Sequence, residues 1–232
     1  MTFERMLRYC VLLEANNDRA WFHENHGFYE EAREDFTDLV DQLKYRVADL
    51  TTPDLAERLI YVRAKELLYR IPRDMRVHRN QPPYNPTWRA YLAGDRHALT
   101  PVGYFLKIAP GDASQFGTGA WCPDMGWTRY FREYISDHAD AFVQALEAGG
   151  LPLEGERLKR LPREFDPDDP AAEYVKNKEW LVSVHFRDEE LTDFDSFEAA
   201  VAEAVTRMEP LRCFWNEAYL RRPRQPWETG RL

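Results

Sequence analysis

The hydrophobic pattern in the first part of the chain is helical. Apolar side chains recur at alternating steps of three and four from Phe28 to Leu50, which is the spacing of one buried helical face. A shorter run of the same kind predicts an amphipathic helix over residues 2–14. Thr51-Thr52-Pro53 predicts the end of the long helix and the cap of another helix that begins near Asp54.

The pattern changes to strands and turns in the middle of the chain. Several prolines exclude a long helix from residue 72 to residue 86, because each removes a helical hydrogen bond. Val102–Ala109 predicts a strand, Pro110-Gly111-Asp112 a turn and Gln115–Trp121 the strand that pairs with it. Gly117-Thr118-Gly119 in the second strand is expected to allow a bulge or a close approach of two backbones.

Helical spacing returns toward the C-terminus and is interrupted by one strand. The pattern predicts a helix that begins at Asp124, has a buried face up to Leu146 and ends at Gly149-Gly150. Asp166–Pro170 predicts a turn that caps a short helix toward Lys176. Residues 180–186 place apolar side chains at every second position, which indicates a half-buried strand. A C-terminal helix follows, and Pro210 is expected to interrupt it before a last short helix.

These elements predict an α+β fold, with helices at both termini around a small, mostly antiparallel central sheet. We expect a single domain over residues 1–220 and a loose C-terminal tail over residues 221–232. Three widely spaced cysteines argue against a disulfide framework, and the N-terminus lacks the pattern of a signal peptide. No apolar stretch approaches the ~20 residues of a membrane span. The sequence therefore predicts a cytoplasmic protein without membrane contact.

Charge is distributed unevenly along the chain. The formal net charge is −9, but residues 58–96 carry nine Lys or Arg against three acids, a net +6 that leaves −15 for the remainder. An acidic protein repels a phosphate backbone at long range, so general nucleic-acid binding is disfavoured. The positive segment is where we expect a binding surface for an anion.

Arginines recur at every third position in this segment, at Arg70, Arg73, Arg76 and Arg79. On a backbone with three residues per turn they form one stripe, and on a strand they alternate between its faces. In both cases two or more guanidinium groups converge, and such forks bind phosphate or carboxylate bidentately. Ion pairing with acids of the chain itself, Asp74 among them, is the alternative interpretation and stays open.

Four further residues extend this candidate site. Tyr84 lies in a rigid Pro-rich segment, where its hydroxyl would contact a ligand or transfer a proton, and a packed loop tyrosine is the alternative. Asp74 would orient an arginine or serve as a base. Lys176 and Lys178 lie one strand step apart, and they either join the arginine surface or form a solvated pair.

Signals for a metal or a cofactor are weak. His23 and His26 share one helical face, but two histidines fall short of the three or four ligands that a metal site needs. Asp166–Asp169 lacks the glycine and distal glutamate of a calcium loop. Gly117-Thr118-Gly119 lacks the lysine of a phosphate loop. The sequence therefore predicts no metal site and no cofactor.

Four blocks, in order along nearly the whole chain, resemble an uncharacterised family known as domain of unknown function 2461. They are Asn16–Phe22 with Asn25 and Tyr29, Arg70–Arg76 with Pro83-Tyr84, Gly119–Pro123, and Leu158–Lys178 in its Leu-Lys-Arg-Leu-Pro and Lys-Asn-Lys parts. Val77-His78-Arg79 departs from the usual Phe-Ser-Lys of that family, and Asp169 replaces a frequent histidine. The resemblance implies a one-domain α+β protein and no particular activity.

Three hypotheses of function stay open. The first is an anion-binding protein, with or without catalysis, in which Arg73 and Arg76 clamp a phosphorylated or carboxylated small molecule. The second is a non-enzymatic interaction protein whose basic surface docks on an acidic partner or on a second copy of the chain. The third is nucleic-acid binding with Tyr84 and Trp88 as stacking platforms.

Overall fold

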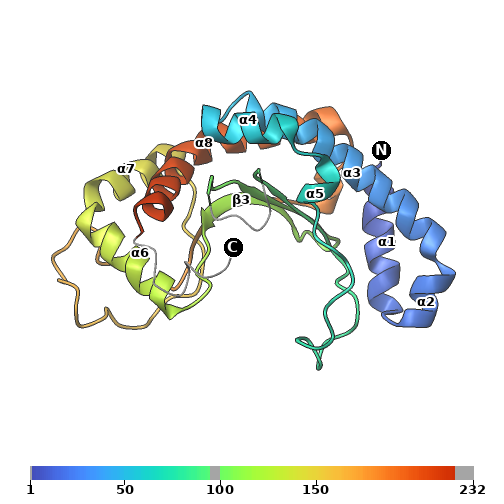
Figure 1. Ribbon diagram of the computed structural model, residues 1–232, viewed down its shortest axis with the longest axis horizontal. Helices are drawn as coiled ribbons and strands as arrows, with labels where there is room; N and C mark the ends of the chain where they lie inside the picture. Colours follow the sequence, from blue (N-terminus) through green and yellow to red (C-terminus); the bar gives the residue numbers. More distant parts are fainter. Residues whose placement is uncertain (1, 95–99, 223–232) are drawn as a thin grey trace. The chain divides into compact units, whose positions relative to one another are not determined.

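The computed structural model describes residues 2–94 and 100–222 (Figure 1). Its chain forms two compact units, the first with Met1–Thr118 and Ser183–Thr206, the second with Gly119–Val182 and Arg207–Leu232. Three elements belong to both units, namely β3 (Ser114–Ala120), β4 (Trp180–Phe186) and α8 (Phe194–Arg221).

Helices form the N-terminal part of the first unit. They are α1 (Phe3–Ala15), α2 (Arg19–Glu24), α3 (His26–Ala48), α4 (Pro53–Tyr61) and α5 (Ala64–Leu67). The Asp18 carboxylate caps α2 by accepting a hydrogen bond from the Trp21 amide (3.0 Å). Pro53 begins α4, where its missing N–H leaves no helical bond unmade. The predicted N-terminal helices are confirmed.

The central sheet has four antiparallel strands in the order β1-β2-β3-β4. The first two strands are β1 (Trp88–Leu92) and β2 (Tyr104–Ile108). Arg89 of β1 lies opposite Lys107 of β2, and Lys107 lies opposite Gln115 of β3. The strands predicted near Val102–Ala109, Gln115–Trp121 and 180–186 are confirmed, whereas β1 was not predicted. The α+β fold with helices at both termini is also confirmed.

The two faces of the sheet differ in the first unit. On β1 the side chains of Trp88, Ala90 and Leu92 are buried, whereas Arg89 and Tyr91 between them are partly exposed. α3 and α5 pack against β1. The Trp88 Nε1 donates a hydrogen bond to the Met6 carbonyl (3.1 Å) and ties α1 to the same face.

A cluster of aromatic rings fills the core of the first unit around Tyr9. Its ring centroid lies 5.4 Å from Phe28, 5.8 Å from Tyr29 and 5.6 Å from Trp88. Tyr9 is fully buried, and its hydroxyl has no hydrogen-bond partner in the described part of the chain. Burial raises the pKa of this phenol, and burial raises the pKa of the adjacent Cys10 thiol to about 12.

The second unit contains α6 (Met125–Asp137) and α7 (Ala139–Gly149). The Asp124 carboxylate caps α6 by accepting bonds from the Gly126 (2.8 Å) and Trp127 (3.1 Å) amides. The predicted start at Asp124 and the predicted end at Gly149-Gly150 are confirmed, whereas the prediction of one continuous helix is wrong. The chain leaves helical geometry at His138 (φ −129°, ψ 37°), where the imidazole stacks on Tyr134 at 4.2 Å.

Residues 163–176 of the second unit form turns, so the short helix predicted toward Lys176 is also wrong. Asp169 explains the difference. Its carboxylate accepts the Ala171 amide (2.7 Å) and its carbonyl accepts the Ala172 amide (2.8 Å). Such local bonds of an aspartate compete with the helical ladder.

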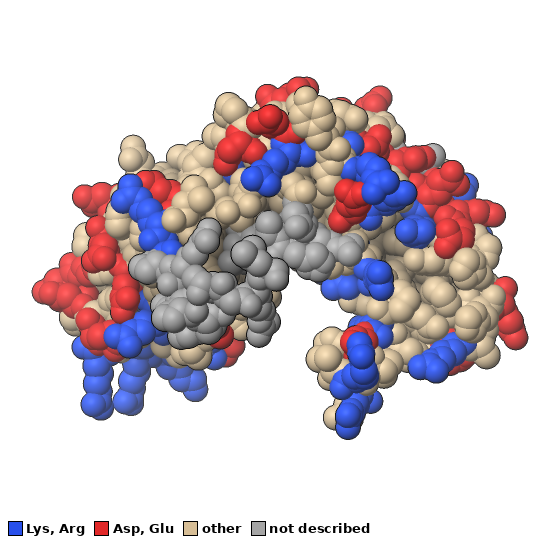
Figure 2. Space-filling view, in the orientation of Figure 1, with Lys and Arg blue, Asp and Glu red and all other residues tan. Residues whose placement is uncertain are grey.

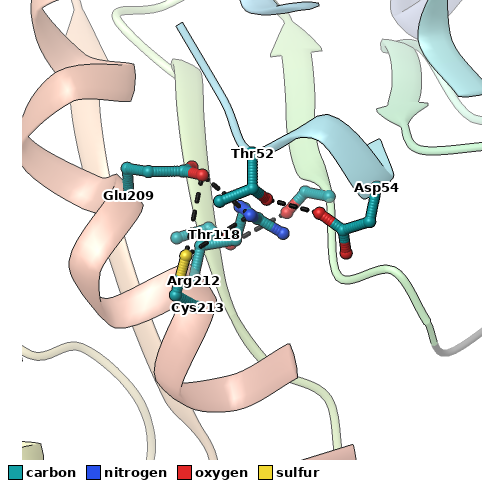
Figure 3. A network of polar contacts seen from close by, with 7 residues as sticks. Thr52, Asp54, Thr118, Glu209, Arg212 and Cys213 are labelled. Carbon is teal, nitrogen blue, oxygen red and sulfur yellow. Dashed lines mark hydrogen bonds and ion pairs between the residues drawn. The ribbon is translucent and has the colours of Figure 1, made fainter. Parts of the chain in front are cut away.

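α8 continues through Pro210, which corrects the expectation that this proline ends the helix. A proline inside a helix costs about 3 kcal/mol, and burial of apolar neighbours such as Met208 and Leu211 offsets that cost. Arg212 on the same helix is fully buried, and its guanidinium makes two bonds of 2.7 Å to the Glu209 carboxylate (Figure 3).

The expected C-terminal tail over residues 221–232 lies mostly outside the described residues. Arg221 ends α8, and the Arg222 guanidinium lies 3.6 Å from the ring centroid of Trp127. Among the helices of the described ranges, none has the length and apolar character to cross a bilayer.

Candidate functional site

The arginine run lies on a hairpin that extends from the sheet of the first unit (Figure 1). Pro72 and Tyr84 form an antiparallel bridge, and the Arg73 amide donates to the Pro83 carbonyl (2.9 Å). We call residues 72–84 the basic hairpin. Figure 2 shows basic side chains gathered on this segment. The prolines thus exclude a helix here, as predicted.

Arg73 holds the basic hairpin together. Its Nη1 donates to the Pro82 carbonyl (2.9 Å) and to the Tyr84 carbonyl across the hairpin. One side of this guanidinium is therefore committed to the backbone. The side chain is only partly exposed.

Arg76 is paired with Asp74 at the exposed end of the basic hairpin. Its Nε donates to Oδ1 of Asp74 (3.0 Å) and its Nη2 to Oδ2 (2.8 Å). These bonds lower the pKa of Asp74 and raise the pKa of Arg76. Ion pairing within the chain, the alternative interpretation of the run, therefore holds for this arginine.

Arg70 and Arg79 keep uncommitted guanidinium groups. Both residues are exposed, and within residues 2–94 and 100–222 neither side chain has a hydrogen bond or an ion pair. The Arg70 backbone carbonyl instead accepts a bond from Arg89 Nη2 (3.5 Å). The four arginines therefore differ in their partners.

Tyr84 is a packing residue as well as a hairpin residue. Its ring stacks on Phe22 at 4.2 Å with an interplanar angle of 7°, and the residue is 7% exposed. The Asn17 side chain accepts the Tyr84 amide and donates to its carbonyl, both at 3.0 Å. Burial raises the pKa of the phenol. The packed alternative describes this ring, and the buried Trp88 likewise offers no free stacking face.

Lys176 and Lys178 both have acidic partners within the second unit. Lys176 Nζ pairs with the Glu173 carboxylate, and Lys178 Nζ lies 2.5 Å from Glu156 Oε1. The hydrogen bond from Lys176 is the main cause of the lowered pKa of Glu173. Each lysine is thus part of a surface ion pair of its own unit.

The structure adds two cations that sequence reasoning missed, Arg89 and Lys107. They lie directly opposite each other on β1 and β2, where like charges destabilise a sheet. Arg89 Nε is buried without a hydrogen-bond partner, and its guanidinium carbon lies 5.4 Å from the Tyr69 ring centroid. The Lys107 side chain has neither an ion pair nor a hydrogen bond within the described residues.

The environment of Arg89 disfavours the charged form of its guanidinium. Burial lowers the pKa of Arg89, the nearby Tyr69 opposes this shift, and the positive charge of Arg73 adds to it. Arg89 thus lies opposite Lys107 in the sheet and feels the charge of Arg73, and within residues 2–94 and 100–222 none of these three side chains has an ion pair. We call these three residues the cationic cluster. Arg89 lies outside the three-residue repeat, so the sequence pattern did not single it out. It comes next to Lys107 only through the register of β1 and β2.

No metal site was predicted. In the ranges that the structure describes, no group of three or more His, Cys, Asp or Glu side chains is placed to hold a metal ion. His26 Nε2 lies 3.8 Å from Glu30 Oε1. The helix expected to carry both His23 and His26 is divided, since α2 ends at Glu24 and α3 begins at His26.

Fold and site together define an α+β protein with an antiparallel sheet, a basic hairpin and a cationic cluster. The chain belongs to DUF2461, a family of conserved hypothetical proteins whose family model matches residues 5–214. The resemblance of the four sequence blocks is thereby confirmed. No curated protein and no solved structure matches the chain.

Proposed function

We propose that this protein binds a small anion of the phosphate or carboxylate class at the cationic cluster. The observation that carries the proposal is the opposed pair Arg89 and Lys107. A partly buried guanidinium without a counter-charge is costly, and a neighbouring cation increases that cost. A bound anion would supply the missing counter-charge and would also reduce the repulsion between the two cations. It would also use the bidentate geometry of arginine.

In this proposal the basic hairpin contributes Arg73 but not Arg76, whereas the sequence alone predicted that both arginines clamp the anion. Arg73 remains a member of the site, because its charge acts on Arg89. Arg76 already has both oxygens of Asp74 as partners. We therefore assign the anion to Arg73, Arg89 and Lys107, with the uncommitted Arg70 beside them.

A thermal-shift titration tests the proposal. The probes are inorganic phosphate, a sugar phosphate and a dicarboxylate, added to wild-type protein and to Arg89→Gln. An anion at 100 times its dissociation constant stabilises by about 2.7 kcal/mol, which raises Tm by roughly 5–10 °C for a chain of this size. Arg89→Gln is expected to lose this gain while its unliganded Tm stays equal or rises, since the substitution removes charge repulsion.

Arg129→Gln is the matched control. It removes the same charge from an exposed ion pair with Glu133 in the second unit, and it should leave the anion response intact. An anion response that survives Arg89→Gln would overturn this site. So would the absence of a response to every probe.

We also propose, as a second candidate, that the end of the basic hairpin docks on the acidic surface of a second copy of this chain, whose residues outside 58–96 carry a net charge of −15. Val77 is 73% exposed between Arg76 and Arg79, and arginine is enriched at protein–protein interfaces. Sedimentation of wild type and Val77→Ser at low and high salt tests docking on a second copy. A monomer under all conditions would contradict that form of docking.

A further inference from the structure

The partly exposed face of the sheet carries two different rows of side chains in the first unit. One row crosses the strands as Arg89, Lys107 and Gln115. The next row pairs Tyr91 with Phe105, two residues further along each strand. Side chains two residues apart on a strand lie on the same face at a spacing of roughly 7 Å. A cationic row therefore lies directly beside an aromatic row.

The aromatic row is held in place but incompletely covered. Tyr91 and Phe105 are both partly exposed, whereas their neighbours Ala90 and Leu106 are buried on the opposite face. The Tyr91 hydroxyl accepts a hydrogen bond from the Gly103 amide (2.8 Å), which fixes this ring. Phe105 makes no aromatic contact with any residue of the described ranges. A partly exposed phenyl ring of an inner strand thus lies beside Arg89 and Lys107, which form no ion pair within the described residues.

We propose that the ligand of the cationic cluster carries a flat unsaturated ring beside its anionic group, as in a nucleoside monophosphate or another aryl-bearing phosphate. This inference rests on the proposed function. The anionic group would bind Arg89 and Lys107, and the ring would lie on Phe105 and Tyr91. The separation between the two rows is one that a mononucleotide spans between its phosphate and its base. Aromatic side chains bind the π-face of any base, so the row selects a ring without specifying which one.

The arrangement favours a small molecule over a nucleic-acid chain. The protein carries a net charge of −9, which repels a polyanion at long range. β1 and β2 are five residues each, so this face offers one cationic row rather than a track of several phosphates. Charge complementarity is therefore satisfied by one or two anionic groups next to a single ring.

Isothermal titration calorimetry with four probes tests the inference. The probes are inorganic phosphate, ribose 5-phosphate, adenosine monophosphate and a short single-stranded oligonucleotide. We expect wild-type protein to bind adenosine monophosphate at least 5-fold more tightly than ribose 5-phosphate, the lower end of what stacking of one base contributes. Phe105→Leu should abolish this preference and leave phosphate binding unchanged, whereas Phe105→Tyr should retain it.

Phe194→Leu is the matched control, because Phe194 is another partly exposed phenylalanine of the first unit, at the start of α8. Equal affinities for adenosine monophosphate and ribose 5-phosphate, with phosphate binding still dependent on Arg89, would overturn the inference and leave the proposed function standing. Tenfold tighter binding of the oligonucleotide than of the mononucleotide would overturn it in favour of a nucleic-acid surface. Failure of every anion to bind would overturn both proposals.

Discussion

The buried Tyr9 and the partly exposed Tyr130 differ in whether their hydroxyl groups have an acceptor. The Tyr9 hydroxyl has no partner in the described part of the structure, whereas the Tyr130 hydroxyl donates to the Ala218 carbonyl at 2.7 Å. A buried unsatisfied hydroxyl costs about 1–3 kcal/mol, and a satisfied one contributes about 1 kcal/mol. Tyr9→Phe is therefore expected to leave the free energy of unfolding equal or to raise it by about 1 kcal/mol.

Tyr130→Phe removes the same atom with the opposite expected sign, a loss of about 1 kcal/mol. Urea denaturation of both variants measures the two changes. A loss of stability in Tyr9→Phe as large as that in Tyr130→Phe would show that the Tyr9 hydroxyl has a stabilising partner. The comparison thus tests whether the aromatic core contains an unsatisfied group.

The Asn17 side chain pairs with the backbone of Tyr84 in the basic hairpin, as the backbone of a neighbouring strand would. Its side chain makes two hydrogen bonds to the Tyr84 backbone, each worth about 1 kcal/mol. Asn17→Ala should destabilise the protein by roughly 1–3 kcal/mol and loosen the hairpin, because both bonds are lost together. The rate of trypsin cleavage measures how far the hairpin loosens, since trypsin cleaves after Arg76 and Arg79 of this segment.

Asn16→Ala is the control for that experiment, because the Asn16 side-chain amide donates to the Leu12 carbonyl of α1 (2.9 Å) and to no other residue of the described ranges. Trypsin should cleave the hairpin of Asn16→Ala at the wild-type rate and that of Asn17→Ala faster. Equal cleavage of the two variants would mean that Asn17 does not secure the hairpin. The asparagine block of the family motif would then need another explanation.

The sequence predicts the candidate site only in part, and the missing part is set by strand register. The arginine run marks the correct segment, and the alternative of ion pairing is the outcome for Arg76. Arg89 and Lys107 are separated along the chain and become opposed only when β1 pairs with β2. No local pattern reports such a pairing, since it depends on long-range contacts.

At the scale of elements, Gly119 shows why a strand needs a residue without a side chain. A Cβ atom at this position would lie 2.1 Å from the Trp180 carbonyl oxygen of the neighbouring strand. The close approach of two backbones that the glycine pair predicts is therefore confirmed at Gly119. Gly119→Ala is expected to lower the free energy of unfolding by several kcal/mol, because the added Cβ would clash with the backbone of β4, which can move only by disrupting the sheet.

Gly27→Ala is the matched substitution at an open position. It lies in α3, and an added Cβ would meet no atom within 4 Å. Alanine in a helix is favoured over glycine by up to about 1 kcal/mol, so the free energy of unfolding should rise slightly. Thermal denaturation of both variants measures the contrast. A similar loss of stability in the two variants would contradict the steric account of Gly119.

Long elements with a clear period are predictable from this sequence, and boundaries set by packing are not. α3 follows from its continuous apolar face, and β4 follows from alternation. α8 passes through Pro210 because buried neighbours on both sides outweigh one lost hydrogen bond. No proline or glycine marks the break between α6 and α7 at His138, so the sequence pattern does not predict it.

At the scale of the whole molecule, the two compact units share β3, β4 and α8. Unfolding one unit alone would interrupt each of these elements in mid-length and remove strand partners from the half that remains. Such elements lose their cooperative hydrogen bonding when they are cut. If residues 1–220 form a single domain, as the sequence predicts, the two units should unfold together in one cooperative transition.

We expect one thermal transition, in which the calorimetric and van't Hoff enthalpies agree. Leu43→Ala in the first unit and Leu146→Ala in the second each remove a buried side chain, at a cost of about 2–5 kcal/mol. Because the elements are shared, both substitutions should lower the same transition, by roughly 4–20 °C. Differential scanning calorimetry of the two variants measures this. Two resolved transitions, with each substitution moving only one of them, would instead show that the units unfold as separate domains.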